Sequence, residues 1–175
     1  LQPTILLCLA FFALVAANTV GIQQFAVPVF TSMFDVSQNY AAFCLIVFVF
    51  GSAGGMLLGG WLADRMRHHE RVAALGLLAA AAFTLPVAMQ SVSPLVLPFL
   101  LFAAGFAGGT TNPSRDMIVR QVTPPGASGK VYGFVYSGLD LGSSLTPLLF
   151  GWLLDRGEPR AVFVVAAVFM LLTIT

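Results

Sequence analysis

Long apolar stretches alternate with short polar segments along this chain. No charged residue interrupts the runs from Leu1 to Phe34, from Val36 to Ala63 and from Val72 to Ser114. A helix needs about 20 apolar residues to cross a bilayer, so the first two runs can each cross once and the third can cross twice. Two more apolar stretches follow. The pattern therefore predicts membrane-spanning helices.

The predicted fold is an all-α membrane protein with six transmembrane helices. We expect the spans at about residues 3–30, 40–63, 72–89, 94–113, 131–154 and 161–175. The last span is too short for a full crossing at a rise of about 1.5 Å per residue, so we expect it to be truncated. Since the chain also lacks an initiating Met, we expect a fragment of a longer protein.

Composition agrees with a membrane protein and argues against several other classes. The chain is 58% hydrophobic and 9% charged, and its mean hydropathy is +0.93. A net charge of +1 without basic and aromatic interleaving gives no case for nucleic acid binding. Cys8 and Cys44 lie in apolar runs, where a thiol usually acts as a small buried hydrophobe.

The sequence gives no sign of catalysis, of a cofactor or of a metal. His68 and His69 are neighbours in a short basic loop, but no Cys or acidic cluster completes a metal site there, and we expect a solvated loop. No nucleophile with a matching base occurs at any membrane depth. We therefore expect a protein that is not an enzyme.

Basic residues mark one side of the predicted bundle. The loop after the second span and the loop after the fourth span each carry three Lys or Arg residues, whereas the loops on the opposite side carry two in total. By the positive-inside rule, the richer loops and both ends of the six-helix unit are cytoplasmic.

Glycines recur along the second and fifth spans. Gly51, Gly55 and Gly59 are four residues apart, so they share one helix face and allow another backbone to approach closely. The fifth span has Gly133, Gly142 and, deep inside it, Pro147. We predict helix packing roles for these positions.

A six-residue motif that occurs twice in the chain predicts a structural repeat. The second span ends in Gly-Trp-Leu-Ala-Asp-Arg at residues 60–65, and the fifth ends in Gly-Trp-Leu-Leu-Asp-Arg at residues 151–156. The two copies close the second helix of consecutive three-helix groups but face opposite sides of the membrane, as expected for two inverted three-helix repeats. An alternative stays open, because Trp followed by a charged pair is common at helix ends.

The end of the second span carries a family resemblance. The major facilitator superfamily has the signature Gly-x-Leu-Ala-Asp-Arg-x-Gly-Arg-Arg or Lys after the second helix of each half, and the chain matches it at Gly60, Leu62, Ala63, Asp64 and Arg65. Arg67 stands in place of the second glycine, and His68 and His69 occupy the basic places. The chain resembles one six-helix half of such a transporter, more like the C-terminal half.

The fifth span is similar to a second signature of this family, Gly-x8-Gly-x3-Gly-Pro-x2-Gly-Gly, which is associated with drug and proton exchange. The residues in register are Gly133, Gly142, Pro147 and Gly151, whereas Thr146 and Phe150 replace two glycines. The match therefore leaves symport and antiport open.

The resemblance implies a function and its partners. It implies half of a 12-helix fold in a bacterial inner membrane that moves a small solute by alternating access, with protons as the coupling ion. The other six helices would come from a missing half or from a dimer partner. The alternative is a membrane sensor or assembly protein of the same fold that does not transport.

The resemblance also implies a cytoplasmic gate. The motif residues are Gly60, Asp64, Arg65, Arg67 and Arg71. Asp64 lies at a helix C-terminus, where its charge needs a cationic partner, and the candidates are Arg65, Arg67, Arg115 and Arg120. We predict that Asp64 with Arg65 forms the gate. The alternative is an interfacial pair that only sets topology.

Asp140 is the strongest candidate for coupling or substrate binding. It lies ten residues after Lys130, about 15 Å along a helix and near the middle of a core about 30 Å thick. A charge there costs about 2.5 to 3.5 kcal/mol and normally faces a cavity or a partner. The residues at helical spacing from it are Tyr136, Ser137, Ser143 and Ser144. The alternative is a protonated structural Asp.

Polar residues of the first span are the remaining candidates. Asn18, Gln23 and Gln24 either line the same cavity as Asp140 or form hydrogen bonds between helices.

Overall fold

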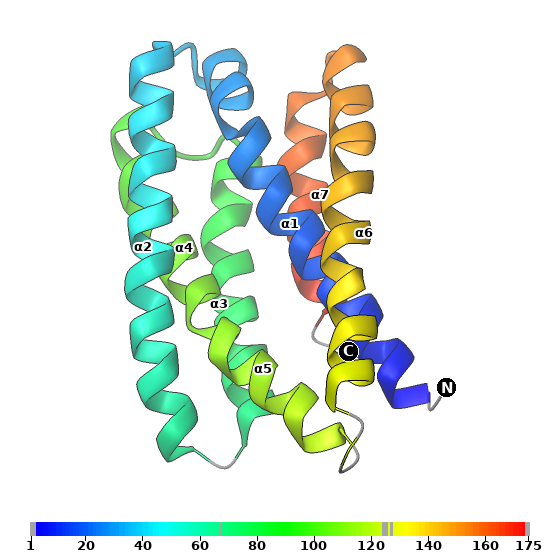
Figure 1. Cartoon of the computed structure of the whole chain (residues 1–175). Helices are drawn as coiled ribbons and strands as arrows, with labels where there is room; N and C mark the ends of the chain where they lie inside the picture. The colour runs from blue at the N-terminus through cyan, green and yellow to red at the C-terminus, as the bar shows by residue number, and fades with distance from the viewer. Residues whose placement is uncertain (1–2, 67, 124–125, 127, 174–175) are drawn as a thin grey trace.

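The computed structural model describes residues 3–66, 68–123, 126 and 128–173 (Figure 1). All regular structure in these ranges is helical, which confirms the predicted all-α class. The helices are α1 (Pro3–Phe34), α2 (Gln38–Arg65), α3 (His69–Ala88), the short 3-10 helix η1 (Pro94–Val96), α4 (Leu97–Gly109), α5 (Thr111–Val122), α6 (Ser128–Asp155) and α7 (Pro159–Leu172).

Among the described residues, four stretches are long and apolar enough to cross a membrane. They are Ile5–Phe34, Gln38–Arg65, His69–Ala88 and Pro94–Gln121. α7 is apolar but shorter, and α6 is 28 residues long without being among the four. The chain is thus an integral membrane protein, and α6 differs from the other long helices in its polar content.

The fourth helical segment extends further than the sequence pattern suggests. The chain turns at Thr110, between α4 and α5, and then remains helical to Val122. Ser114 and Val119 of α5 have no exposed surface, because this helix packs against α3 and α2 and also touches α1. Its charged residues made this segment look like a loop, although burial of its other face keeps it helical.

α2 and α4 pack backbone against backbone. A Cβ atom added at Gly51 or Gly55 would come closer than 3.0 Å to the carbonyl oxygens of Phe102 and Phe106 on α4, and one at Gly59 would come as close to that of Thr110, directly after α4. The contact is reciprocal, because Gly105 and Gly109 of α4 lie against the backbones of Phe48 and Ser52 on α2. Residue numbers rise in the same direction along both helices, so the pair is parallel.

α1 and α6 form a second parallel pair with the same kind of contact. A Cβ atom at Gly138 or Gly142 of α6 would overlap the carbonyl oxygens of Leu9 and Ala13 on α1. Gly133 differs, since a Cβ atom there would meet no described atom within 4 Å. Pro147 lies inside α6, as expected from its sequence position.

The connections lie at two ends of the bundle (Figure 1). We call the inner end the one where α2 joins α3 and α5 joins α6, and the outer end the one where α1 joins α2 and α6 joins α7. α2 ends at the inner end and α6 ends at the outer end, so the two Trp-Leu-x-Asp-Arg segments lie at opposite ends of the molecule.

Candidate functional site

α6 presents a polar strip that no other described helix covers. Asp140 and Ser144 are exposed one turn apart, and Ser137 lies one turn before Asp140 with partial exposure. The buried strip of α6 faces α1 through Gly138 and Gly142. A third strip is apolar and exposed, with Leu141, Leu145 and Leu148. The helix is therefore amphipathic, and its polar strip accounts for its absence from the four apolar stretches.

The hydroxyl groups near Asp140 do not bond its carboxylate. Ser143 donates to the backbone carbonyl oxygen of Asp140 at 3.1 Å, and Ser137 donates to the Phe134 carbonyl at 2.6 Å. Tyr136 turns to another helix and donates to Oδ1 of Asp116 at 3.1 Å. The sequence thus placed Tyr136, Asp140 and Ser144 along one helix, but the structure directs the Tyr136 hydroxyl away from Asp140.

Four residues toward the inner end contact one another, and we call them the inner cluster: Phe12, Arg115, Asp116 and Tyr136. The Arg115 guanidinium lies 4.6 Å from the Phe12 ring centre, and the Tyr136 ring lies 5.2 Å from the same centre. Asp116 accepts from Tyr136 and lies 3.6 Å from Nε of Arg115. The Arg115 side chain is only 14% exposed. The cluster joins α1, α5 and α6.

The sequence did not predict the inner cluster as a set. Tyr136 was a candidate beside Asp140 and Arg115 a candidate partner of Asp64, whereas Phe12 and Asp116 were not predicted site residues. Arg115 and Asp116 lie in a segment that the sequence pattern assigned to a loop, and Phe12 resembles any other apolar residue of the first span. A usable signal was the four-residue spacing of Ser114, Ile118 and Val122, which is typical of one face of a helix.

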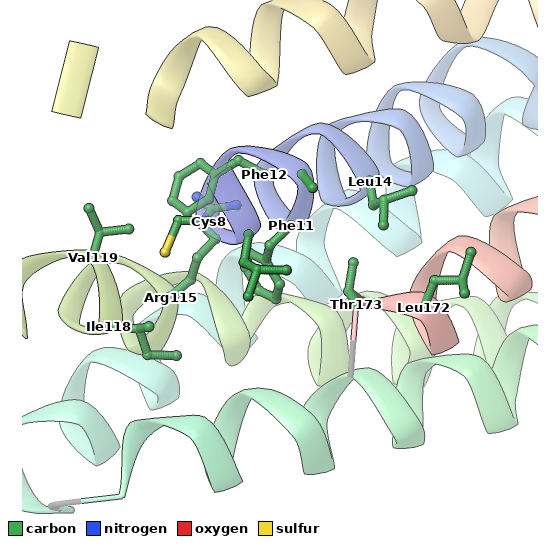
Figure 2. Close-up of a pocket in the computed structure, with 11 residues that line it drawn as sticks. Cys8, Phe11, Phe12, Leu14, Arg115, Ile118, Val119, Leu172 and Thr173 are labelled. Carbon is green, nitrogen blue, oxygen red and sulfur yellow. The ribbon is translucent and has the colours of Figure 1, made fainter. Parts of the chain in front are cut away.

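A largely apolar cavity of about 260 Å³ adjoins the inner cluster (Figure 2). Arg115 is its charged lining residue, beside Cys8, Phe11 and Leu14 of α1 and Ile118 of α5. The end of α7 contributes Leu172 and Thr173. Asp140, Asn18 and Gln23 do not line this cavity, so it is distinct from the predicted site.

Among the described residues, no hydrogen bond joins the polar side chains of α1 to the Asp140 carboxylate. Oδ1 of Asn18 is buried and has no hydrogen-bond partner among the described residues. Gln23 is exposed, and neither side chain is recorded in a hydrogen bond with Asp140. Because a buried amide oxygen without a partner is costly, Asn18 needs a water molecule, a ligand or another protein group to satisfy it.

The predicted gate residues Asp64 and Arg65 at the inner end of α2 form no ion pair with each other among the described residues. Asp64 and Arg65 are both exposed, and the Arg65 guanidinium lies 4.0 Å from the centre of the Trp61 ring. Among the described side chains, Asp64 makes no ion pair, whereas Arg115 pairs with Asp116. Arg67 lies outside the described residues.

Two other motif residues border open space. A Cβ atom at Gly60 would meet no described atom within 4 Å. Arg71 is exposed and lines an apolar cavity of about 320 Å³ between α2, α3 and α4. The outer end of α6 repeats the Arg65 arrangement, because the Arg156 guanidinium lies 3.9 Å from the Trp152 ring centre. Each of these residues is 91 positions after its counterpart at the inner end of α2.

Solved structures share this fold. A crystal structure of the peptide transporter POT in complex with sulfate aligns with a TM-score of 0.84 and 21% identity over 97% of this chain and 36% of the transporter. The in meso structure of the POT family transporter PepTSo gives a TM-score of 0.85 and 18% identity over 99% of this chain and 36% of the transporter.

Sequence relatives carry transporter names. The chain is 30% identical to the putative uncharacterized transporter YgaY of Escherichia coli over 147 residues, which are 79% of this chain and 34% of YgaY. It is 28% identical over 148 residues to a multidrug resistance protein B homolog of Mycobacterium tuberculosis, covering 83% of this chain and 27% of the relative. The chain thus spans about a third of the length of these relatives.

A family model described as Major Facilitator Superfamily matches residues 7–175. The match includes all the helices from α2 to α7 and most of α1. The chain therefore belongs to the Major Facilitator Superfamily.

Proposed function

We propose that this chain is one half of a secondary active transporter that moves a small solute by alternating access and couples this movement to protons. The polar strip of α6 carries the proposal. An acid in the interior of a membrane helix normally faces a cavity or a partner, and Asp140 is exposed beside Ser144 with no described helix over it. The second half of the transporter would close the other side of this pathway.

Asn18 and Gln23 are proposed to contribute from α1. The unpaired amide oxygen of Asn18 favours a polar ligand or water within reach of this helix. α1 and α6 are in backbone contact, so their polar residues belong to one rigid pair. We assign Asp140 to coupling and Ser144, Asn18 and Gln23 to solute or water binding, whereas Tyr136 acts within the inner cluster.

The proposed architecture includes an inverted repeat within the chain. The helix α1 begins at Pro3 and η1 at Pro94, and the Trp-Arg contacts at the ends of α2 and α6 have the same separation in sequence. The same separation of 91 residues relates α1 to the η1–α4 segment and α2 to α6. The parallel pair of α1 with α6 therefore corresponds to the parallel pair of α4 with α2. We propose that residues 3–88 and 94–172 are two inverted repeats.

The inner end is proposed to face the cytoplasm of a bacterial inner membrane. Arg65 and Arg71 flank the α2–α3 connection, and Lys130 follows the α5–α6 connection at the same end. The positive-inside rule assigns this end to the cytoplasm. Asp64 and Arg65 then lie where a cytoplasmic gate would close, and the acid would find its partner on the second half.

Flux measurements on vesicles test the proposal. The full gene product is reconstituted, and uptake of a radiolabelled panel of sugars, organic anions and dipeptides, together with efflux of the lipophilic cation ethidium, is followed with and without an imposed pH gradient. We expect at least one compound to move, faster with the gradient. A folded protein that moves none of them under either condition would favour a sensor or assembly protein of the same fold.

A further inference from the structure

Gln90 has an unusual backbone conformation at the outer end of α3. Its φ angle is 52°, in the left-handed region, where glycine is the usual residue after a helix end. The N–H of Ser91 closes the helix by donating to the Pro86 carbonyl at 3.2 Å. The local backbone alone would favour Gly or Asn at position 90, so a large side chain there calls for a reason.

The side chain of Gln90 joins two other helix ends. Its Nε2 group donates to the carbonyl oxygen of Met33 at 2.5 Å, and its Oε1 atom accepts from the guanidinium of Arg160. Met33 lies in the last turn of α1, where carbonyl oxygens lack partners within the helix, and Arg160 is the second residue of α7. One amide thus connects the ends of α1 and α3 with the start of α7.

The amide of Gln90 satisfies both partners at once. The Met33 carbonyl requires a donor and the Arg160 guanidinium requires an acceptor, so the orientation of the amide is fixed. A carboxylate at position 90 would still accept from Arg160 but would face the Met33 carbonyl without a donor. An Asn would tolerate the left-handed backbone better but is one methylene shorter.

We propose that Gln90 is a clasp that holds the outer ends of α1, α3 and α7 together, and that its side chain is retained at the expense of backbone strain. The clasp lies beside a small polar cavity of about 180 Å³ lined by Ser32, Glu158 and Arg160. It is a conformational device of the fold and does not depend on the proposed transport. Release of the clasp would let the outer end of α1 separate from α7.

Asp35 offers a matched control. It follows the end of α1 with a φ angle of 51°, nearly the same as that of Gln90, and it is exposed. No hydrogen bond of its side chain is recorded among the described residues. Glycine at position 35 therefore removes backbone strain and nothing else, whereas glycine at position 90 removes the same strain together with the clasp.

Thermal unfolding of the purified full gene product in one detergent tests the proposal. We expect Asp35→Gly to raise the unfolding temperature and Gln90→Gly to lower it by several degrees. Gln90→Asn should also lower it. A rise with Gln90→Gly similar to that with Asp35→Gly would overturn the clasp, because Gln90 would then be no more than a strained helix cap.

Hydrogen exchange separates the two arms of the clasp and remains informative if Gln90→Gly yields too little protein. We expect Gln90→Glu to speed amide exchange in the last turn of α1, at residues 31–34, several-fold, with little change at residues 160–164 of α7. Arg160→Gln should show the reverse pattern. Unchanged exchange at both helix ends in both variants would also overturn the proposal.

Discussion

Gly55 of α2 lies directly against the backbone of Phe106 on α4. A Cβ atom at Gly55 would be closer than 3.0 Å to the Phe106 carbonyl oxygen, an approach that real side chains do not make. A Cβ atom added at the neighbouring Gly54 would meet only the Phe106 ring, with Cδ2 of the ring 3.5 Å away. Two adjacent glycines therefore have different reasons to be present.

This contrast predicts opposite effects for the same substitution. Gly55→Ala should destabilise the protein by about 1 to 3 kcal/mol, because α2 and α4 must move apart. Gly54→Ala should be neutral or slightly stabilising, since alanine favours the helix by up to about 1 kcal/mol. Thermal or denaturant unfolding in a fixed detergent measures both. Equal effects of the two substitutions would contradict the backbone contact.

The inner cluster makes a similar prediction for two tyrosines of α6. Tyr136→Phe removes the hydrogen bond to Asp116 and should cost about 0.5 to 1.5 kcal/mol, or up to about 3 kcal/mol if the charge of Asp116 strengthens the bond. Tyr132 stacks on Tyr136 with ring centres 5.8 Å apart, and its hydroxyl forms no hydrogen bond with another described residue. Tyr132→Phe should therefore have little effect. If the two variants unfold alike, the Asp116 bond does not contribute.

The two ends of the repeated motif should differ in function. Asp64→Asn at the inner end should slow transport several-fold without reducing the amount of folded protein, because a gate needs the charge of the acid. Asp155→Asn at the outer end of α6 is the matched control and should leave the rate close to that of the unmodified protein. Uptake rates normalised to folded protein decide this prediction, and equal rates for Asp64→Asn and the unmodified protein would exclude the gate.

Thiol labelling tests the orientation. His68 and Ser93 are both exposed, at the inner and outer ends respectively, and the native Cys8 and Cys44 are buried. A membrane-impermeant maleimide should label Ser93→Cys in intact cells and should label His68→Cys only after the membrane is permeabilised. The reverse pattern would place the inner end outside the cytoplasm.

Much of the fold could be predicted because membrane crossing leaves a strong signal. Uncharged runs located α1, α2 and α3, and the spacing of Gly51, Gly55 and Gly59 predicted a close helix contact before its partner was known. The partner helix, α4, could not be found in this way. Helix periodicity shows which face carries the small residues, but the topology decides which other helix packs against that face.

The candidate site was less predictable. Asp140 was identified from its depth in an apolar span, but the orientation of Tyr136 toward Asp116 depends on α5 continuing past residue 113. The clasp at Gln90 gave no sequence signal at all. It depends on a left-handed backbone conformation and on helix ends that are distant in sequence, Met33 and Arg160.

The role of Asp140 is the central claim, and the pH dependence of transport by Asp140→Asn tests it most directly. Ser144→Ala, one turn away on the same strip, is the control for a general loss of the polar face. With a compound from the vesicle panel that the unmodified protein moves, we predict that Asp140→Asn loses the acceleration by a pH gradient, whereas Ser144→Ala keeps it. Full pH dependence in Asp140→Asn would contradict the account.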